Sequence, residues 1–325
     1  MSISAPISAP IPRRQAARRA LAILLASAAL LTVAVPIARA EPITVVTSFS
    51  ILGDLTQRLG GTRIAVHTLV GPDADAHVYQ PTPSDAKALA RARLVVVNGL
   101  GYEGWIDRLI KSAAYHGDVL VASRGIEPLK NADAGHDPGA VKGKRHHHDT
   151  GADPHAWQDL KNAGQYVGNI AKALIAADPS GKAHYQANAE KLQGDIARLD
   201  AEIRQQLGAI PAERRKVVTS HGAFAYFARA YQVDFRAPAG VSTDAEASAA
   251  SVGKLIRQIR KEKIPAVFIE NISDPRLLER IRAETGARIG GTLYSDALSK
   301  ADGPAATYLD MMRHNARTLA AALAP

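Results

Sequence analysis

The chain has 325 residues, of which 46% are hydrophobic and 22% charged, with a formal net charge of +9 and no cysteine. This length suits two domains of ordinary size, and the lack of cysteine excludes disulfides and thiolate metal ligands. The basic residues form no stripe with interleaved aromatic residues, which argues against a nucleic-acid partner. Because the chain has no cysteine, any bound metal must be held by His, Asp or Glu.

The first 40 residues have the pattern of an export signal. A basic start with four arginines precedes an uncharged, mostly apolar run over 20–35, and the segment ends with Ala38-Arg39-Ala40. The run is shorter than the roughly 20 apolar residues of a spanning helix, which favours a cleaved signal over a retained membrane anchor. We predict that residues 1–40 are a signal peptide cut after Ala40. The export route stays open, and the mature chain is expected to be a soluble periplasmic protein with a net charge of about +4.

Residues 41–180 alternate short β-branched runs with helical patterns. Predicted strands cover 43–47, 64–70, 94–98 and 119–123, and predicted helices cover 50–59, 84–92, 105–113 and Trp157 to about Ala177. Alternation of this kind is typical of a parallel sheet covered by helices, so we predict an N-terminal α/β lobe here. Residues 127–153 interrupt it with glycines, lysines, acids and a histidine run, and they are predicted to form a mobile surface loop.

A long amphipathic helix is predicted to connect this lobe to the rest of the chain. Over 182–208, apolar residues recur at steps of three or four, from Tyr185 to Leu207. A helix of roughly 27 residues is about 40 Å long, which is more than an ordinary crossover needs. We assign residues 181–210 to a stiff connector.

Residues 211–325 repeat the alternation and are predicted to form a C-terminal α/β lobe. Predicted strands cover 217–220, 233–237, 266–270 and 288–294, and predicted helices cover 223–231, 251–263, 274–286 and 304–323. The predicted fold class is therefore α/β, with two Rossmann-like lobes of parallel sheet joined by one long rigid helix.

Four polar residues lie near strand ends, where open α/β sheets place their ligands. His77 follows the strand that ends at Val70, and His155 precedes the helix predicted from Trp157. His221 follows strand 217–220, and Asp296 follows strand 288–294. Each lobe contributes two of them, so facing lobes would bring all four into the cleft between them. Three imidazoles and a carboxylate suit a divalent ion such as Zn²⁺.

Prolines and acids surround the first two histidines. Prolines restrict the backbone and lower the cost of ordering a metal site, and the nearby ones are Pro72, Pro81, Pro83 and Pro154. Nearby acids are candidates to orient the second ring nitrogen of a ligating histidine, and they are Asp73, Asp75, Asp85, Asp153 and Asp159. Glu270, at the end of strand 266–270, is expected either to support a ligand in this way or to supply a substitute oxygen.

Each of these residues has a simpler explanation when it is considered alone. A histidine in a proline-rich turn is more often a hydrogen-bonding group than a metal ligand, so the joint pattern carries the hypothesis. His67 is predicted to pack in the core of its strand and is not included. The tract His146–His148, with His136, is either a loose metal site or a solvated loop.

Four segments together resemble the zinc- and manganese-binding solute-binding proteins of ABC importers, often called cluster A-I. The segments are HVYQPTPSD (77–85), DPHAWQD (153–159), TSHGAFAYFARAY (219–231) and LYSDALS (293–299). The resemblance spans nearly the whole mature chain. It implies a monomeric periplasmic protein that binds metal between its lobes and delivers it to a membrane permease. The family's ligand positions fall on His77, His155, His221 and Asp296.

The third ligand position bears on the choice of metal, because many manganese binders in that family have glutamate there. His221 therefore favours Zn²⁺ as the cargo, with Mn²⁺ as the alternative. A zinc hydrolase is the main rival, but four protein ligands would leave no open position for water, and no HExxH or GxSxG motif is present. A surface adhesin is disfavoured by the lack of a cysteine for lipid anchoring. We predict binding rather than catalysis, with metal affinity falling below a pH of about 6.5.

Overall fold

The computed structural model describes residues 1–2, 41–130 and 151–324. The predicted signal peptide with its cleavage site, and the part of the predicted loop that holds His136 and His146–His148, lie outside the described residues. Pro42–Pro325 form one compact unit that contains every element named below. Within the described ranges, no helix combines the length and apolar character that crossing a bilayer would need.

The first sheet consists of four parallel strands in the order β2-β1-β3-β4. Its strands are β1 (Ile43–Phe49), β2 (Ile64–Val70), β3 (Leu94–Val97) and β4 (Asp118–Val121). The central strands bury Val45, Val46 and Val96 completely, as expected for strands covered on both faces. Their connections contain α2 (Ser50–Gly60), α3 (Pro83–Ala90) and α4 (Ile106–Ser112). The carboxyl ends of all four strands therefore lie at one edge of the sheet.

One prediction in this lobe is wrong. His67 lies in β2, but its side chain is exposed rather than packed in the core. The reason is that β2 is an edge strand, paired only with β1, so the middle of the strand is incompletely covered. Periodicity identified the strand but not its place in the sheet.

The segment after the first sheet differs slightly from the expected single helix. Lys130 pairs with Ala152 in an isolated antiparallel bridge, and a short 3-10 turn follows over Ala156–Gln158. The α-helix α5 (Leu160–Ala177) begins only after this turn. Asp159 is its N-cap, because the side chain of Asp159 accepts a hydrogen bond of 2.9 Å from the N–H of Lys161.

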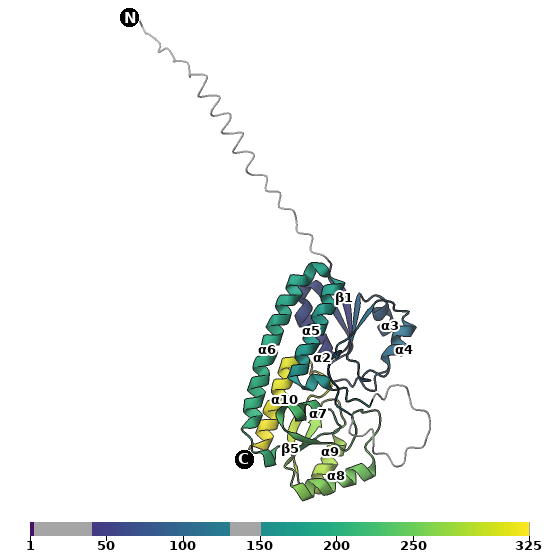
Figure 1. Cartoon of the computed structure of the whole chain (residues 1–325), viewed down its shortest axis with the longest axis vertical. Coiled ribbons are helices and arrows are strands. Elements are labelled where there is room, and N and C mark those ends of the chain that lie inside the picture. The colour runs from purple at the N-terminus through teal and green to yellow at the C-terminus, as the bar shows by residue number, and fades with distance from the viewer. Residues whose placement is uncertain (3–40, 131–150, 325) are drawn as a thin grey trace. The chain divides into compact units, whose positions relative to one another are not determined.

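The long helix α6 (Lys182–Gly208) is present as predicted. Its buried side chains recur every three or four residues, and they are Tyr185, Leu192, Ile196, Leu199, Ile203 and Leu207. Figure 1 shows α6 running beside both lobes. It contacts α2 and α5 of the first lobe and α7 (Ala225–Tyr231) and α10 (Tyr308–Leu323) of the second.

The second sheet repeats the topology of the first. Its strands are β5 (Lys216–Val218), β6 (Asp234–Arg236), β7 (Ala266–Glu270) and β8 (Arg288–Leu293), all parallel in the order β6-β5-β7-β8. Two more helices, α8 (Ala249–Glu262) and α9 (Arg276–Thr285), complete the lobe. The predicted architecture of two parallel-sheet lobes with a long helix is therefore confirmed.

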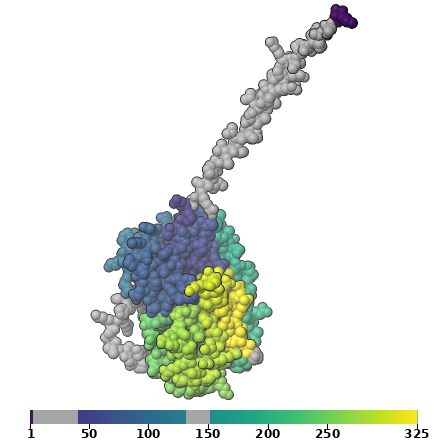
Figure 2. All heavy atoms as spheres, turned by 180° about the vertical axis from the view of Figure 1, so that it is seen from behind, coloured from purple at the N-terminus to yellow at the C-terminus, as the bar shows by residue number. Residues whose placement is uncertain are grey.

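The hydrophobic core is continuous from one lobe to the other. One buried cluster includes Val45 of β1, Leu199 of α6, Phe227 of α7 and Leu319 of α10. A smaller cluster fills the space between the second sheet and helices α8 and α9. Figure 2 shows the early segments and the C-terminal segments in direct contact on the other face of the molecule. The lobes are therefore joined by packed side chains as well as by α6.

Candidate metal centre

The structure brings His77, His155, His221 and Asp296 together between the lobes. Each offers one ligand atom, and these atoms all lie within 4.8 Å of one another. Nε2 of His77 is 3.4 Å from Nε2 of His155. Oδ2 of Asp296 lies 3.2 Å from Nε2 of His77 and 3.1 Å from Nε2 of His221, and Oδ1 lies 3.4 Å from Nε2 of His155. Four atoms around Zn²⁺ at 2.0–2.1 Å in a tetrahedron stand about 3.3 Å apart. These four separations are close to that value.

Each of the four side chains lies in a loop at the carboxyl end of a strand or just before a helix. His77 is in the loop after β2, His155 precedes the 3-10 turn, His221 follows β5, and Asp296 follows β8. Asp296 is positioned from the opposite lobe, because the side chains of Trp157 and Gln158 both donate hydrogen bonds to the carbonyl oxygen of Ser295. Hydrogen bonds between the two lobes therefore lie directly beside the cluster.

The cluster is almost completely removed from solvent. His155 and Asp296 are 0% exposed and His221 is 1% exposed, while the side chain of His77 is 4% exposed. Burying a carboxylate and imidazoles is costly unless charges and hydrogen-bonding groups are matched. Oδ1 of Asp296 is buried without a hydrogen-bond partner among the described residues. A cation bound between the four groups would satisfy this oxygen.

Buried carboxylates hold the far ring nitrogen of two of the histidines. Nδ1 of His155 lies 2.8 Å from Oδ1 of Asp153, and Nδ1 of His221 lies 2.8 Å from Oε2 of Glu270. Because Nδ1 is held, Nε2 of each ring is directed at the cluster. The contact of Glu270 with the ring of His221 is what the first of its two expected roles, support of a ligand, requires.

The other acids near the first two histidines bind backbone N–H groups or polar side chains instead of a ring. Asp75 accepts a hydrogen bond of 2.9 Å from the N–H of His77 and one of 2.5 Å from the hydroxyl of Thr243 in the second lobe. Asp85 forms a capping box with Thr82 at the start of α3, and Asp159 caps α5. Asp73 accepts a hydrogen bond of 3.0 Å from Asn271. Of the acids predicted as ring partners, only Asp153 contacts a ring in this way.

Aromatic residues that the sequence did not single out line the site. The ring of Tyr102 lies 4.7 Å from that of His77, and the ring of Trp157 lies 5.2 Å from that of His155. Both aromatic residues are buried, and the hydroxyl of Tyr102 is 3.4 Å from the backbone oxygen of Asp296. Trp157 was visible only as a helix residue, and no pattern in the sequence placed Tyr102 near the cluster.

Charges within the cluster shift its pKa values strongly. Burial alone lowers the pKa of His155, but the charge of Asp296 and the hydrogen bond with Asp153 outweigh it and raise that pKa to about 9. For His221, burial again acts downward, and the charges of Glu270 and Asp296 raise the pKa well above its usual value. Burial raises the pKa of Asp296, yet the neighbouring His155 and His221 hold it well below its ordinary range. The free site therefore attracts positive charge, as protons or as a metal ion.

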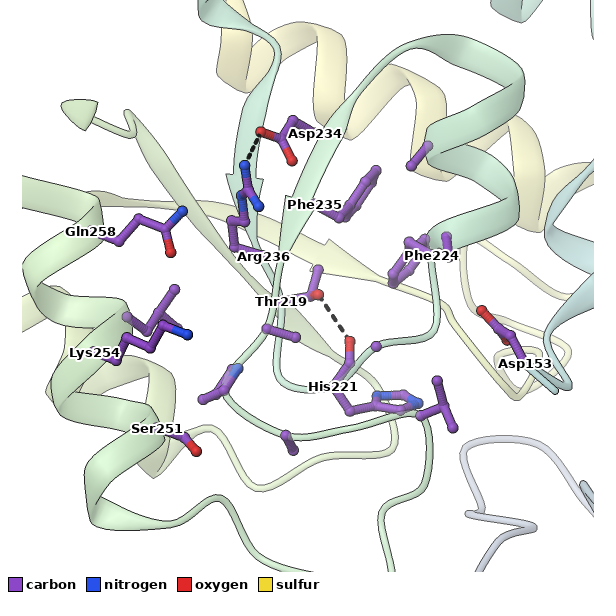
Figure 3. Close-up of a pocket in the computed structure, with 18 of the residues that line it drawn as sticks. Asp153, Thr219, His221, Phe224, Asp234, Phe235, Arg236, Ser251, Lys254 and Gln258 are labelled. Atoms are coloured by element: carbon purple, nitrogen blue, oxygen red, sulfur yellow. Dashed lines mark hydrogen bonds and ion pairs between the residues drawn. The ribbon is translucent and has the colours of Figure 1, made fainter. Parts of the chain in front are cut away.

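A cavity of about 590 Å³ adjoins His221 on the second-lobe side (Figure 3). Side chains of β6, α7 and α8 line it, and Asp153 lies on the wall toward the first lobe. Its charged residues are of both signs, and Arg236 is paired with Asp234 at 2.7 Å. The lining therefore does not select one class of ligand.

Comparison with known proteins places this architecture in a described family. The family model for "zinc-uptake complex component A periplasmic" matches residues 45–322. The manganese-binding lipoprotein MntA of Halalkalibacterium halodurans is 34% identical over 285 residues, covering 87% of this chain and 89% of the relative. The iron-binding protein YfeA of Yersinia pestis is 35% identical over 283 residues, covering 86% of each chain. The structure of the periplasmic zinc binding protein TroA from Treponema pallidum superposes with a TM-score of 0.79 at 30% identity, covering 87% of this chain and all of that one.

Proposed function

This chain belongs to the zinc-uptake complex component A family of periplasmic proteins, and on that premise we propose that it captures Zn²⁺ at His77, His155, His221 and Asp296. The family comprises metal-binding substrate-binding components of ABC transporters, not enzymes. The observation that carries the proposal is the buried cluster itself, in which two lobes each contribute two ligands and two of the rings are oriented by carboxylates.

The donor set supports zinc ahead of manganese. Imidazole nitrogen suits Zn²⁺, whereas Mn²⁺ favours oxygen ligands, and at a given site zinc generally binds more tightly than manganese. Three of the four donors here are imidazoles. The relatives do not favour zinc, since manganese is the metal in most of their names, whereas YfeA is named for iron and TroA for zinc. We retain Mn²⁺ as the alternative cargo.

Capture requires that the site exchange its protons for the ion. Imidazole binds metal only when it is neutral, so each bound ion displaces protons from the free site. Asp153 and Glu270 keep Nε2 of their histidines directed at the ion, and the aromatic wall of Tyr102 and Trp157 keeps water out. Four protein ligands close a tetrahedral sphere and leave no position for a catalytic water.

The metal assignment is tested by elemental analysis combined with competition. Protein purified from its natural compartment without added metal should contain one Zn²⁺ per chain. Zn²⁺ should also displace Mn²⁺ in a chelator-buffered titration. His221→Glu should reduce the preference for Zn²⁺ over Mn²⁺, because it should lower the affinity for Zn²⁺ more than the affinity for Mn²⁺. Manganese in the native protein together with a preference for Mn²⁺ in the titration would reverse the assignment.

We further propose that the protein acts in the periplasm as a monomer and passes its metal to a membrane permease. The relative MntA is named a lipoprotein, whereas the 325 residues here contain no cysteine. The proposal expects a periplasmic species that begins at Glu41 after cleavage behind Ala40. Intact-mass measurement of the periplasmic fraction, with light scattering of the same sample, tests both points. An uncleaved, membrane-held species would contradict the proposed processing.

A further inference from the structure

Helix α8 carries an excess of exposed basic residues. Five cations occupy the helix and the residue that caps it, namely Lys254, Arg257, Arg260, Lys261 and Lys263, and all are exposed. The one acid of the helix is Glu262, whose carboxylate is paired with Lys216 at 2.9 Å. Across 211–325 the chain has 17 Lys and Arg against 12 Asp and Glu, whereas 41–210 has 18 against 19. The net positive charge therefore belongs to the second lobe.

The cations of α8 lie on the face opposite its packed side. Val252, Leu255, Ile256 and Ile259 are buried against the lobe. Lys254, Arg257 and Lys261 are spaced three and four residues apart and form one exposed stripe, of which Lys254 also lines the cavity beside His221. In Figure 1 this helix lies at the end of the second lobe that faces away from the first.

Most of these basic side chains are not paired with a neighbouring acid. Among the described residues, Lys254, Arg257, Lys261 and Lys263 form no ion pair within 4 Å, and Arg260 donates a hydrogen bond to the backbone oxygen of Glu284 instead. The adjacent helix α9 behaves differently, because Arg276 pairs with Asp274 and Arg280 with Glu284. Arg282 is the one arginine of α9 without an ion pair among the described residues, so α8 carries the larger number of unpaired cations.

The stripe lacks the features of a protein-binding surface. The centre of such an interface is usually apolar or aromatic and poor in charge. The exposed large hydrophobic residues of the described chain are Met1, Val78 and Ile289, and none of them lies on α8. Flexible cationic side chains on a convex helix instead match a fluid surface of anionic headgroups.

We propose that the basic face of α8, defined by Lys254, Arg257 and Lys261, binds the anionic phospholipid surface of the membrane. Such binding would hold the protein near the bilayer whether or not metal is bound, since α8 contributes none of the four cluster residues. The attraction acts over about a Debye length and weakens as salt is added. This proposal does not depend on which metal the site carries.

The test is co-sedimentation of the mature chain with vesicles of phosphatidylglycerol and phosphatidylcholine, compared with phosphatidylcholine alone. We expect binding to the anionic vesicles only, and loss of binding as salt rises. The variant K254Q/R257Q/K261Q should bind about a hundredfold more weakly. The matched control K87Q/R91Q/K111Q removes the same charge from exposed positions of the first lobe and should keep most of the binding. Zn²⁺ content should be unchanged in both, which shows that both fold.

Three results would overturn the proposal. One is no binding to anionic vesicles at low salt. Another is an equal loss in both variants, which would make the effect one of net charge alone. The third is binding to vesicles only when the permease is embedded in them, with the α8 variant defective there, which would assign the face to a protein partner.

Discussion

The two lobes support their histidines in different ways. In the first lobe His155 contacts Asp153, which lies two residues earlier in the same loop. In the second lobe His221 contacts Glu270, which lies 49 residues away at the end of the neighbouring strand β7. The ring-to-carboxylate distance is 2.8 Å in both. The contacts are equal in length, but Asp153 lies in the same loop as His155, whereas Glu270 lies in a strand of the sheet.

Both carboxylates also bind the backbone. Oδ1 of Asp153 accepts a hydrogen bond of 2.9 Å from the N–H of His155. Glu270 binds two backbone groups rather than one. Its Oε1 also accepts hydrogen bonds from the backbone N–H of Ser220, at 2.7 Å, and of His221, at 3.0 Å. One carboxylate thus positions both the backbone and the side chain of a ligand, and it does so from inside a strand. The comparison teaches that the histidine of the second lobe is supported from a strand of the sheet, whereas His155 of the first lobe is supported from its own loop.

Removing a ligand from either lobe is expected to have the largest effect. His155→Ala and His221→Ala should each weaken Zn²⁺ binding by more than about a hundredfold, since even loss of an outer support costs about 10- to 100-fold. Competition with a fluorescent chelator measures this. His67→Ala is the control, because His67 is exposed on β2, and it should bind normally. Near-normal affinity in either ligand variant would remove that histidine from the site.

Replacing the carboxylate that contacts each histidine ring should weaken Zn²⁺ binding to a different extent in each lobe. Glu270→Gln is expected to weaken Zn²⁺ binding by about a hundredfold and Asp153→Asn by about tenfold, because Glu270 accepts hydrogen bonds from two backbone N–H groups and Asp153 from one. The same competition assay measures both. Glu262→Gln, a carboxylate of α8 paired with Lys216, is a control that should leave affinity unchanged. Equal losses would show that the local and the distant support are equivalent.

The raised pKa of His155 predicts the pH dependence of binding. With that pKa near 9, a proton occupies the free ring at neutral pH, so Zn²⁺ affinity should keep rising between pH 7 and 9 by up to about tenfold per unit. The sequence alone placed the change near the ordinary imidazole pKa of about 6.5. Asp153→Asn should move the plateau to lower pH, since Asp153 helps raise this pKa. A flat profile above pH 7 in the unaltered protein would contradict the pKa shift.

The smallest effect is expected from the histidine tract. Replacing His146, His147 and His148 together by Ala should change affinity at the buried centre by less than about twofold, because His77, His155, His221 and Asp296 already offer four ligand atoms. Isothermal titration with Zn²⁺ would also report any additional weak sites lost. A large drop in affinity at the tight site would connect the tract to capture.

Much of the arrangement follows from local sequence patterns. Strand runs, the helix over 182–208 and the position of each histidine or aspartate after a strand could be predicted, because periodicity and turn residues act over a few positions. The pairing of His221 with Glu270 needed the strand order β6-β5-β7-β8, which periodicity does not contain. Predicting that His67 is exposed would also have required the order of the strands in its sheet. The α-helix begins at Leu160 rather than at Trp157, because the side chain of Asp159 caps its first turn.

The continuous core described above has a consequence for unloading. Side chains of β1, α6, α7 and α10 share one buried cluster, so the halves of the molecule cannot swing apart without exposing it to water. We therefore expect opening to be confined to the segments that carry His77, His155, His221 and Asp296. A receptor that engages only those rim segments can empty the carrier while the framework behind them stays still.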